Sequence, residues 1–323
     1  KTFEAKKTYE HLLCLEPNHI DASNNLGILL QDMGDIDGAV QTLKKALLTD
    51  PESIKTALNL CEVYEKSNHL DELEKLLDEI KNRYETKGED LLFYDAVLKF
   101  RRHNIEGSLH VILKINETKL SKSRLGLFYQ LKAKCLDSLG NFESAFENFR
   151  KMNAESASTN KVDIEKKHRY RKMIIDRNSD ILNYQFGRRS YVDEFKIEPV
   201  FLVGFPRSGT TLTDTILRSH SKISVIEEMP LVTDIARDIL VDQTIAEIEA
   251  LSSDTISKAR KSYMESIRDL TVSIDGGIIV DKLPMNIVEV PFLHALFPQA
   301  KLIFVLRHPL DSILSNFMQN FKL

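Results

Sequence analysis

A short apolar run, a glycine-bounded loop and a helix-like pattern follow one another at residues 200–212, and this order constrains the fold of the second half. The run from Val200 to Val203 has the length of a buried strand. The loop extends from Gly204 to Gly209, where the helical pattern begins. A strand that passes through a tight loop into a helix directs backbone N–H groups at one point, which suits an anion. We therefore expect this segment to bind a phosphate-like group.

The residue types in this loop argue against ATP or GTP as its ligand. The Gly-x-x-x-x-Gly spacing matches the phosphate loop of nucleotide-hydrolysing proteins, in which Lys follows the second glycine. The chain has Thr210 at that position, and Arg207 is the cation inside the loop. The loop therefore fits another phosphorylated donor better, although a P-loop phosphotransferase is kept as an alternative.

Composition excludes several classes of protein. A chain of 323 residues is long enough for two or three domains, and 42% hydrophobic with 28% charged residues is ordinary for a soluble globular protein. The net charge of −4 gives no reason to expect nucleic acid as a partner. The apolar runs are strand-sized, so we expect no membrane span. Cys14, Cys61 and Cys135 are few and widely separated, which favours a reducing, cytoplasmic setting and indicates no metal site.

The first half contains a repeat of 34 residues, the separation of Pro17 and Pro51. Small residues alternate with large ones between these prolines, in a pattern that resembles the tetratricopeptide repeat. The same register fits residues 1–17, 57–80 and 129–152, whereas residues 91–115 are a degenerate copy. The matching positions of the best copy are Leu26, Gly27, Leu30, Gly34, Ala39, Leu43 and Ala46. We expect residues 1–159 to form a tetratricopeptide helical repeat domain that begins inside a longer array.

The apolar positions of this repeat half are expected to be core residues at helix contacts, because such residues recur at helical spacing. Solenoids of this kind present a concave face, where we expect a protein partner. Residues 160–197 are predicted to form a helical linker. Its Arg and Lys side chains are interleaved with acidic residues, which favours a solvated helix face over a binding patch.

From about Glu198 the pattern changes to short β-branched runs that alternate with longer helical segments, which predicts a parallel sheet flanked by helices. The expected strands are residues 200–203, 223–226, 277–280 and 301–306, and residues 253–270 are an expected helix. Ligands of such sheets bind beyond the carboxyl ends of the strands. Because Arg207, Lys282 and Arg307 each follow a clear strand, we expect the three cations to converge on one edge.

Two segments carry a specific resemblance. Phe205-Pro-Arg-Ser-Gly-Thr-Thr-Leu212 resembles the 5′-phosphosulfate loop of sulfotransferases that use 3′-phosphoadenosine 5′-phosphosulfate (PAPS). The segment from Val305 to Ser315 resembles their 3′-phosphate motif, with a Ser eight residues after Arg307, and residues 219–228 and 281–307 add support. The chain is similar to tyrosylprotein sulfotransferases and to bacterial tetratricopeptide sulfotransferases.

The resemblance implies an α plus α/β fold class. A helical solenoid would be followed at residues 198–323 by a P-loop-like α/β sulfotransferase domain with a parallel sheet. Domains of this family continue further, so we expect this one to be truncated at its C-terminus and to expose apolar surface.

The same resemblance implies where PAPS binds. Ser208, Gly209, Thr210 and Thr211 would hold the 5′-phosphate and the sulfuryl oxygens together with Arg207. Arg307 and Ser315 would hold the 3′-phosphate. The simpler explanations are that the two threonines cap the helix and that Arg307 and Ser315 are an ion-paired arginine and an ordinary helical serine.

Sulfuryl transfer resembles phosphoryl transfer, an in-line displacement in which negative charge moves onto the leaving oxygen. Lys282 would stabilise that oxygen, unless it is only a surface lysine. The resemblance implies that Glu228 is the general base, with Glu227 expected to point elsewhere, towards the acceptor. His220 is a competing base. We expect no metal.

The predicted function is therefore transfer of the sulfuryl group of PAPS to an acceptor hydroxyl, on tyrosine in a peptide or on a glycan. One alternative is a repeat scaffold whose α/β half binds a nucleotide without turnover. The other is the P-loop phosphotransferase.

Overall fold

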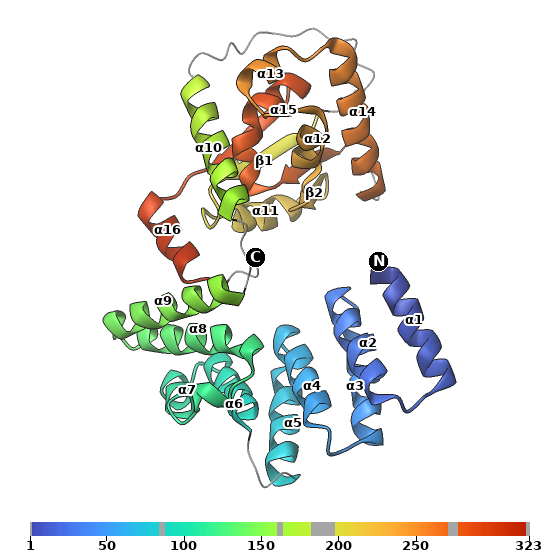
Figure 1. Cartoon of the computed structure of the whole chain (residues 1–323), viewed down its shortest axis with the longest axis vertical. Coiled ribbons are helices and arrows are strands. Elements are labelled where there is room, and N and C mark those ends of the chain that lie inside the picture. The colour runs from blue at the N-terminus through green and yellow to red at the C-terminus, as the bar shows by residue number, and fades with distance from the viewer. Residues whose placement is uncertain (1, 84–87, 160–163, 182–197, 271–276, 321–323) are drawn as a thin grey trace. The chain divides into compact units, whose positions relative to one another are not determined.

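The computed structural model describes residues 2–83, 88–159, 164–181, 198–270 and 277–320. The chain divides into two compact units, residues 1–160 with 320–323 and residues 161–319. Figure 1 shows a helical N-terminal unit and a unit that contains the sheet. No helix in the described ranges combines the length and the apolarity that a membrane crossing needs.

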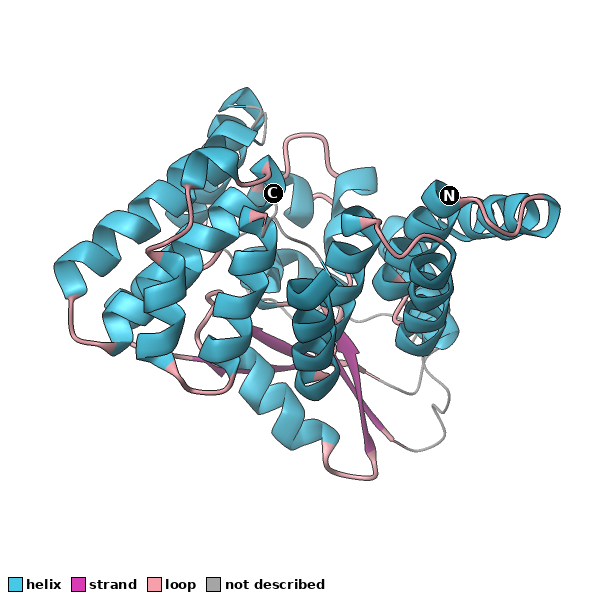
Figure 2. Cartoon of the chain, turned by 90° about the horizontal axis from the view of Figure 1, so that it is seen from below, coloured by secondary structure: helices cyan, strands magenta, loops and turns pink. Residues whose placement is uncertain are grey.

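The first unit consists of helices that pack against their neighbours along the chain. Figure 2 colours the helices of the chain cyan and the strands of the sheet magenta. Their bounds are α1 Thr2–Leu15, α2 Ile20–Asp32, α3 Ile36–Thr49, α4 Ile54–Lys66, α5 Leu70–Arg83, α6 Glu89–Arg101, α7 Ile105–Ile112, the short 3₁₀ helix η1 Glu117–Lys119, α8 Lys122–Ser138 and α9 Phe142–Thr159. The prediction of a helical repeat half is confirmed.

The small residues of the repeat lie where helices touch. A Cβ built on Gly27 of α2 would lie 2.6 Å from Cγ of Leu43 on α3. Ala39 and Leu43 are fully buried, in a core cluster that continues through α4, α5 and α6. The absence of a side chain at residue 27 therefore sets how closely α2 and α3 approach.

Residues in the turns determine where these helices end and begin. Gly34 has a φ of 83°, a left-handed backbone that glycine adopts without a Cβ clash. The Asp35 side chain then accepts a hydrogen bond of 3.0 Å from the Gly38 N–H and caps the start of α3. The end of α2 and the start of α3 thus have local causes.

The second unit is a parallel four-stranded sheet in the order β2-β3-β1-β4, covered by helices. Its elements are α10 Ile164–Asp180, β1 Val200–Gly204, α11 Thr210–Arg218, β2 Ile223–Glu227, α12 Leu231–Ile239, α13 Ile245–Glu249, α14 Ser253–Leu270, β3 Ile278–Lys282, η2 Pro284–Glu289, α15 Val290–Leu296, β4 Lys301–Val305 and α16 Pro309–Phe317. The predicted parallel sheet is confirmed.

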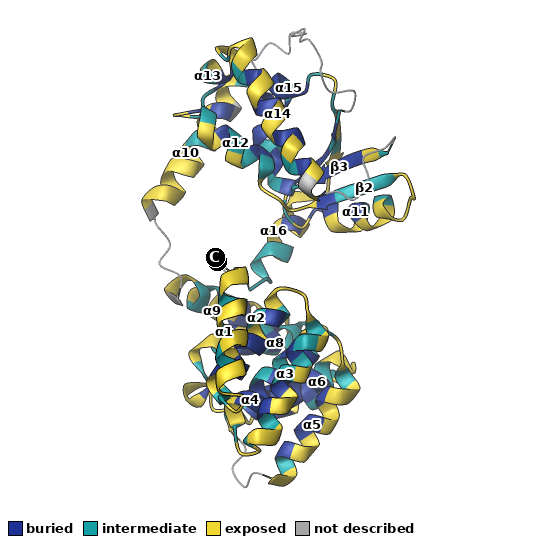
Figure 3. Ribbon diagram, turned by 90° about the vertical axis from the view of Figure 1, so that its right-hand side faces the viewer, coloured by how far each residue is buried: buried dark blue, intermediate teal, exposed yellow. Residues whose placement is uncertain are grey.

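The two faces of the sheet have different contents. Phe201 and Asp281 are register partners whose side chains lie on the face covered by α12, α14 and α15, where the apolar core cluster of the unit gathers. Leu202 and Lys282 are partners on the other face, which α11 covers. Figure 3 shows dark-blue buried residues along β3 and on the inner sides of the helices, whereas β2 is largely teal. One face of the sheet thus packs against the apolar core, and the other face carries Lys282 at the carboxyl end of β3.

Two further features of this unit concern α10, which lies within the predicted helical linker, and β4, in the domain where exposed apolar surface was expected. The helix α10 is held against the rest of the second unit by Arg177, which donates a hydrogen bond of 2.8 Å to the buried Glu289 carboxylate and another to the Gln243 carbonyl oxygen. The strand β4 leaves Leu302 and Phe304 exposed.

Candidate active site

The loop between β1 and α11 folds back tightly on the sheet. A Cβ on Gly204 would lie 2.8 Å from the Val305 carbonyl oxygen and 2.9 Å from Oγ of Ser208, so only glycine fits there. Arg207 and Gly209 both have left-handed backbones, with φ angles of 69° and 109°. These turns direct the loop into the N-terminus of α11.

The side chains of Thr210 and Thr211, the first two residues of α11, do not cap this helix. Gly209 is the N-cap residue and supplies no side chain, and the helix continues from Thr210, which is buried. The explanation of Thr210 and Thr211 as simple caps is therefore wrong. The buried hydroxyl of Ser208 has no hydrogen-bond partner within the described part of the chain. A buried donor of this kind is rare unless a ligand satisfies it, so the loop fits an anion.

The two predicted phosphate motifs meet at this loop. Arg307 follows β4 and donates a hydrogen bond of 3.1 Å from Nη1 to the backbone carbonyl oxygen of Arg207. The Arg207 side chain in turn donates from Nε to Oγ of Ser315 on α16, at 3.2 Å. Arg207, Arg307 and Ser315 therefore lie together, although Arg207 is 100 positions from Arg307 and 108 from Ser315 in the sequence.

Asn316 is a contact that the sequence analysis missed. Its Nδ2 donates a hydrogen bond of 3.0 Å to the Pro206 carbonyl oxygen and another to the carbonyl oxygen of Ser312. It therefore ties α16 to the loop directly. Its place beside Ser315 in the sequence was the only available signal.

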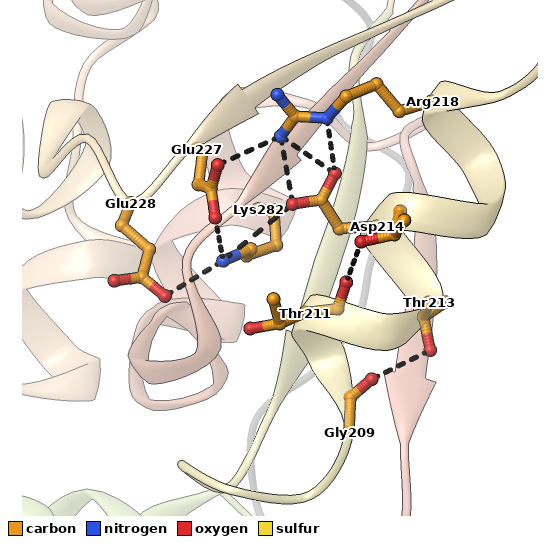
Figure 4. A network of polar contacts seen from close by, with 9 residues as sticks. Gly209, Thr211, Thr213, Asp214, Arg218, Glu227, Glu228 and Lys282 are labelled. Atoms are coloured by element: carbon orange, nitrogen blue, oxygen red, sulfur yellow. Dashed lines mark hydrogen bonds and ion pairs between the residues drawn. The ribbon is translucent and has the colours of Figure 1, made fainter. Parts of the chain in front are cut away.

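Lys282 lies at the carboxyl end of β3 with a side chain that is 0% exposed. Its Nζ donates hydrogen bonds of 3.1 Å to Oε1 of Glu227 and 2.8 Å to Oε1 of Glu228 (Figure 4). The explanation of Lys282 as a surface lysine is therefore wrong. A buried ammonium with two carboxylates stands at the end of the strand next to β1.

Both glutamates reach the same lysine, which corrects the expectation that Glu227 points elsewhere. Glu227 is the register partner of Lys282 in the parallel pair β2–β3, so their side chains share a face. The next residue of a strand would face the opposite side. Glu228 instead has a left-handed φ of 53°, and its N–H donates to the Lys282 carbonyl oxygen at 2.7 Å. This turn brings Glu228 back to Lys282.

Asp214 and Arg218 on α11 complete this cluster, and the sequence analysis did not single them out. Arg218 donates from Nε to Oδ1 of Asp214 at 3.0 Å and from Nη2 to Oε2 of Glu227 at 3.1 Å. Their spacing of four residues on one helix was the available signal, because such side chains lie on one face.

The ion pairs fix the protonation states at neutral pH. Burial lowers the pKa of Lys282, but the hydrogen bonds from its ammonium to Glu228 and Glu227 outweigh this and raise the pKa above its ordinary value. The Lys282 hydrogen bond and charge hold the pKa of Glu227 below its usual range, and Arg218 adds to this. Lys282 is therefore a cation beside an ionised Glu227.

Asp281 lies one residue before Lys282 but belongs to the opposite face. Its Oδ2 accepts a hydrogen bond of 2.7 Å from the Tyr263 hydroxyl inside the core. Burial raises the pKa of Asp281 to about 6, and the Tyr263 hydrogen bond offsets part of this. Asp281 thus has no access to the cluster around Lys282.

His220, the competing base, lies away from this edge. It follows the end of α11, and its Nδ1 accepts a hydrogen bond of 3.1 Å from the Lys222 N–H in the turn before β2. It thus stands at the amino end of β2, whereas Glu228 follows the carboxyl end. The described residues contain no group of three or more His, Cys, Asp or Glu side chains suited to a metal ion.

Comparison with protein families finds two matches. Residues 199–323 match the model of the Sulfotransferase family, and residues 3–53 and 30–87 match the tetratricopeptide repeat. The second half is therefore a sulfotransferase-family domain and the first half contains tetratricopeptide repeats, as the sequence motifs predicted.

Two curated relatives match the chain in part. An uncharacterized protein of Aquifex aeolicus is 37% identical over 130 residues, which cover 38% of this chain and 17% of the relative. Nodulation protein NoeE of Sinorhizobium fredii is 30% identical over 119 residues, which cover 34% of this chain and 28% of the relative. The chain thus spans less than a third of the length of either relative.

Among solved structures, the chain is similar to a tetratricopeptide repeat protein from Parabacteroides merdae, at 17% identity and a TM-score of 0.41 over 57% of this chain and 73% of that one. MamA from Desulfovibrio magneticus is 16% identical with a TM-score of 0.38, over 49% of this chain and 86% of that one.

Proposed function

We propose, from the sulfotransferase-family domain at residues 199–323, that the protein transfers the sulfuryl group of PAPS to an acceptor hydroxyl. The acceptor that we propose first is tyrosine in a peptide, because the implied base is a glutamate, Glu228. A glycan hydroxyl is the second acceptor class. No metal takes part in the proposed reaction.

The observation that carries this proposal is the buried Lys282 ammonium at the carboxyl end of β3, 2.8 Å from Glu228. The phosphate loop has no lysine of its own, since Thr210 stands at that position. The neighbouring strand β3 supplies the ammonium instead. A fixed cation and a carboxylate side by side are what stabilisation of a leaving oxygen and proton removal from a hydroxyl require.

The donor would be held at both of its phosphates. Loop amides from Ser208 to Thr211, the unpartnered Ser208 hydroxyl and Arg207 are suited to the 5′-phosphosulfate. The Arg307 guanidinium and the Ser315 hydroxyl are suited to the 3′-phosphate. The contact of 3.2 Å between Arg207 and Ser315 supports one continuous anion site.

In the proposed step, Glu228 accepts the proton of the acceptor hydroxyl while the hydroxyl oxygen forms a bond to sulfur. The bond between sulfur and the oxygen of the 5′-phosphate breaks, and Lys282 stabilises the charge that collects on this oxygen. The products are the sulfated acceptor and adenosine 3′,5′-bisphosphate.

We propose further that the tetratricopeptide repeats, residues 1–159, hold a protein partner or a peptide acceptor on their concave face, and that residues 160–197 connect the two domains. Binding along a concave face is the common use of such solenoids. This part of the proposal rests on the repeat family alone.

Ligand-induced stabilisation tests the donor class. We expect adenosine 3′,5′-bisphosphate to raise the melting temperature of the full-length protein more than ATP with Mg²⁺ does, because a ligand stabilises the state it binds. The opposite order would favour the P-loop phosphotransferase. Transfer of ³⁵S-labelled sulfate from PAPS to panels of tyrosine peptides and glycans then tests turnover. Tight binding of PAPS with no transfer to any panel would favour the scaffold.

A further inference from the structure

An ion pair on α11 stands beside the proposed catalytic groups. Asp214 has a side chain that is 3% exposed, and its Oδ1 and Oδ2 accept hydrogen bonds of 3.0 and 2.9 Å from Nε and Nη2 of Arg218 (Figure 4). The fork of the guanidinium therefore engages both oxygens of the carboxylate. This two-point contact fixes the orientation of Arg218 on α11.

Asp214 also lies near the proposed leaving-group lysine. Its Oδ2 is 3.9 Å from Nζ of Lys282, which is close enough for attraction and too far for a hydrogen bond. A buried carboxylate that loses its cation is strongly unfavourable. If Arg218 were absent, Lys282 would be the nearest described cation that Asp214 could recruit. By pairing with Asp214, Arg218 thus prevents this carboxylate from competing for the Lys282 ammonium.

The two glutamates are held to different extents. Glu227 is shared between Lys282 and Arg218, through its two carboxylate oxygens. Within the described residues, Glu228 forms its ion pair with Lys282 alone, and its side chain is 58% exposed. Glu228 is therefore the carboxylate that an incoming anion can displace more easily.

We propose that Arg218 and Asp214 are positioning residues of the sulfotransferase site. They retain Glu227 on Lys282 and neutralise each other, which leaves Glu228 as the exchangeable partner of the ammonium. The 5′-phosphosulfate of the donor takes the place of Glu228 on Lys282. The displaced Glu228 carboxylate then becomes available to the acceptor hydroxyl. This inference rests on the proposed function.

The arrangement couples binding of the donor to release of the Glu228 carboxylate, two events that would otherwise be independent. Before the donor binds, Glu228 neutralises Lys282 and is itself engaged. After the donor binds, the ammonium faces the phosphosulfate oxygen and the carboxylate is released. The proton acceptor is thereby set free only when the 5′-phosphate end of a bound nucleotide occupies Lys282.

Binding of adenosine 3′,5′-bisphosphate to the full-length protein, measured by calorimetry at neutral pH, tests the inference without an acceptor. We expect Arg218→Gln to weaken binding about tenfold, because Asp214 then competes for Lys282. The double variant Asp214→Asn with Arg218→Gln should recover binding to within about threefold of wild type. We expect Glu228→Gln to tighten binding by about threefold or more, because the competing carboxylate is gone.

Matched controls separate these effects from net charge. Arg237→Gln removes an exposed cation that pairs with Asp234 on α12, and Glu265→Gln removes an exposed carboxylate on α14. Both should bind as wild type does. Because loss of Arg218 strands a buried carboxylate, melting temperatures are recorded for every variant. Glu228→Gln keeps the inference testable even if Arg218→Gln unfolds, since the Glu228 side chain is exposed.

The outcomes distinguish two failures. If the wild-type protein does not bind adenosine 3′,5′-bisphosphate, the proposed function fails and the inference fails with it. If the wild type binds and Arg218→Gln behaves like Arg237→Gln, the inference alone is wrong. It is also wrong if the double variant stays as weak as Arg218→Gln, because direct contact of Arg218 with the ligand would then explain the loss. A Glu228→Gln variant that does not bind more tightly than Glu265→Gln contradicts the exchange.

Discussion

Tyr263 and Asp281 form a hydrogen bond of 2.7 Å between two fully buried side chains, on the face of β3 opposite to Lys282. The bond joins α14 to the sheet inside the apolar core. It supplies the partner for a carboxylate that would otherwise be buried without one, so it supports the strand that carries Lys282.

Tyr263→Phe should therefore destabilise the protein by about 1–3 kcal/mol near pH 8, because a buried acceptor loses its donor. We expect Tyr170→Phe, at a half-exposed side chain, to change the stability little. Melting temperatures of the two variants check this. Equal melting temperatures for both would show that the hydrogen bond contributes nothing.

Asp281 also predicts a pH dependence. Its pKa is about 6 in the folded chain against 3.8 for the ordinary side chain, so the folded state binds more protons between these values. Its contribution to stability is complete below 3.8 and is lost as the pH rises through about 6. We expect the stability of Asp281→Asn relative to wild type to increase from about pH 4 to about pH 7, measured from thermal unfolding at several pH values. A difference that is constant with pH would contradict the assignment.

Gly204→Ala should disrupt the loop. The added Cβ would lie 2.8 Å from the carbonyl oxygen of Val305, a backbone atom that cannot move without shifting β4. We expect a cost of about 1–3 kcal/mol and a loss of adenosine 3′,5′-bisphosphate binding, measured by unfolding and calorimetry. The control is Gly88→Ala, where nothing lies within 4 Å of the added carbon and binding should persist. Full binding by the Gly204 variant would show that the loop tolerates a wider approach.

The buried ion pair of Arg177 and Glu289 predicts a sharp effect on stability. Both side chains are 5% exposed, and the Nη1–Oε2 distance is 2.8 Å. Arg177→Ala leaves an uncompensated buried carboxylate and should cost about 3–5 kcal/mol, whereas Arg171→Ala on the exposed side of α10 should be nearly neutral. Part of the loss should return when Glu289→Leu is combined with Arg177→Met. Thermal unfolding of the variants measures this, and equal melting temperatures for the two alanine variants would rule the prediction out.

Gly27 and Leu43 test the packing of the repeats. Gly27→Ala places a carbon 2.6 Å from Leu43 and should cost about 1–3 kcal/mol by overpacking. Leu43→Ala alone should cost about 2–5 kcal/mol through the cavity it leaves. The double variant should lose less than the sum, because the new methyl group enters that cavity. Additive losses in a urea-unfolding cycle would mean that the two side chains do not compete for space.

Turnover separates the two proposed catalytic roles from binding. Glu228→Gln should lower sulfuryl transfer by about a hundredfold or more while the nucleotide still binds, because only proton removal is lost. Lys282→Met should lower transfer by about 10²–10³-fold, because the leaving oxygen loses its cation. Both are measured with ³⁵S-labelled PAPS once an acceptor is identified. Transfer at the wild-type rate by Glu228→Gln would assign the base to another group.

Much of the fold follows from local patterns in the sequence. The repeat spacing that ends at Pro17 and Pro51 predicts paired helices, and the run from Val200 to Val203 predicts a buried strand. Both are present, and the strand ends one residue later than predicted, at Gly204. Such features are predictable because the period of apolar residues and the position of turn residues act within a few neighbours along the chain.

The site residues were predictable only where they belong to a recognisable sequence motif. The sequence placed Arg207, Lys282 and Arg307 after strands, and the parallel order of those strands brings their ends to one edge. It did not predict that Glu227 and Glu228 share one lysine, because this depends on the register of β2 with β3 and on a left-handed residue at the strand end. The sequence carries no local signal for either.

The sequence by itself thus determined the repeat helices, the strands and the glycine loop, because each depends on contacts between residues close in the chain. The tertiary structure alone decided that Arg218 stands between Asp214 and Glu227, and that Lys282 is wholly buried beside them. The physical reason is that charge pairing and desolvation depend on distance in space. The residues that set them here come from three separate elements.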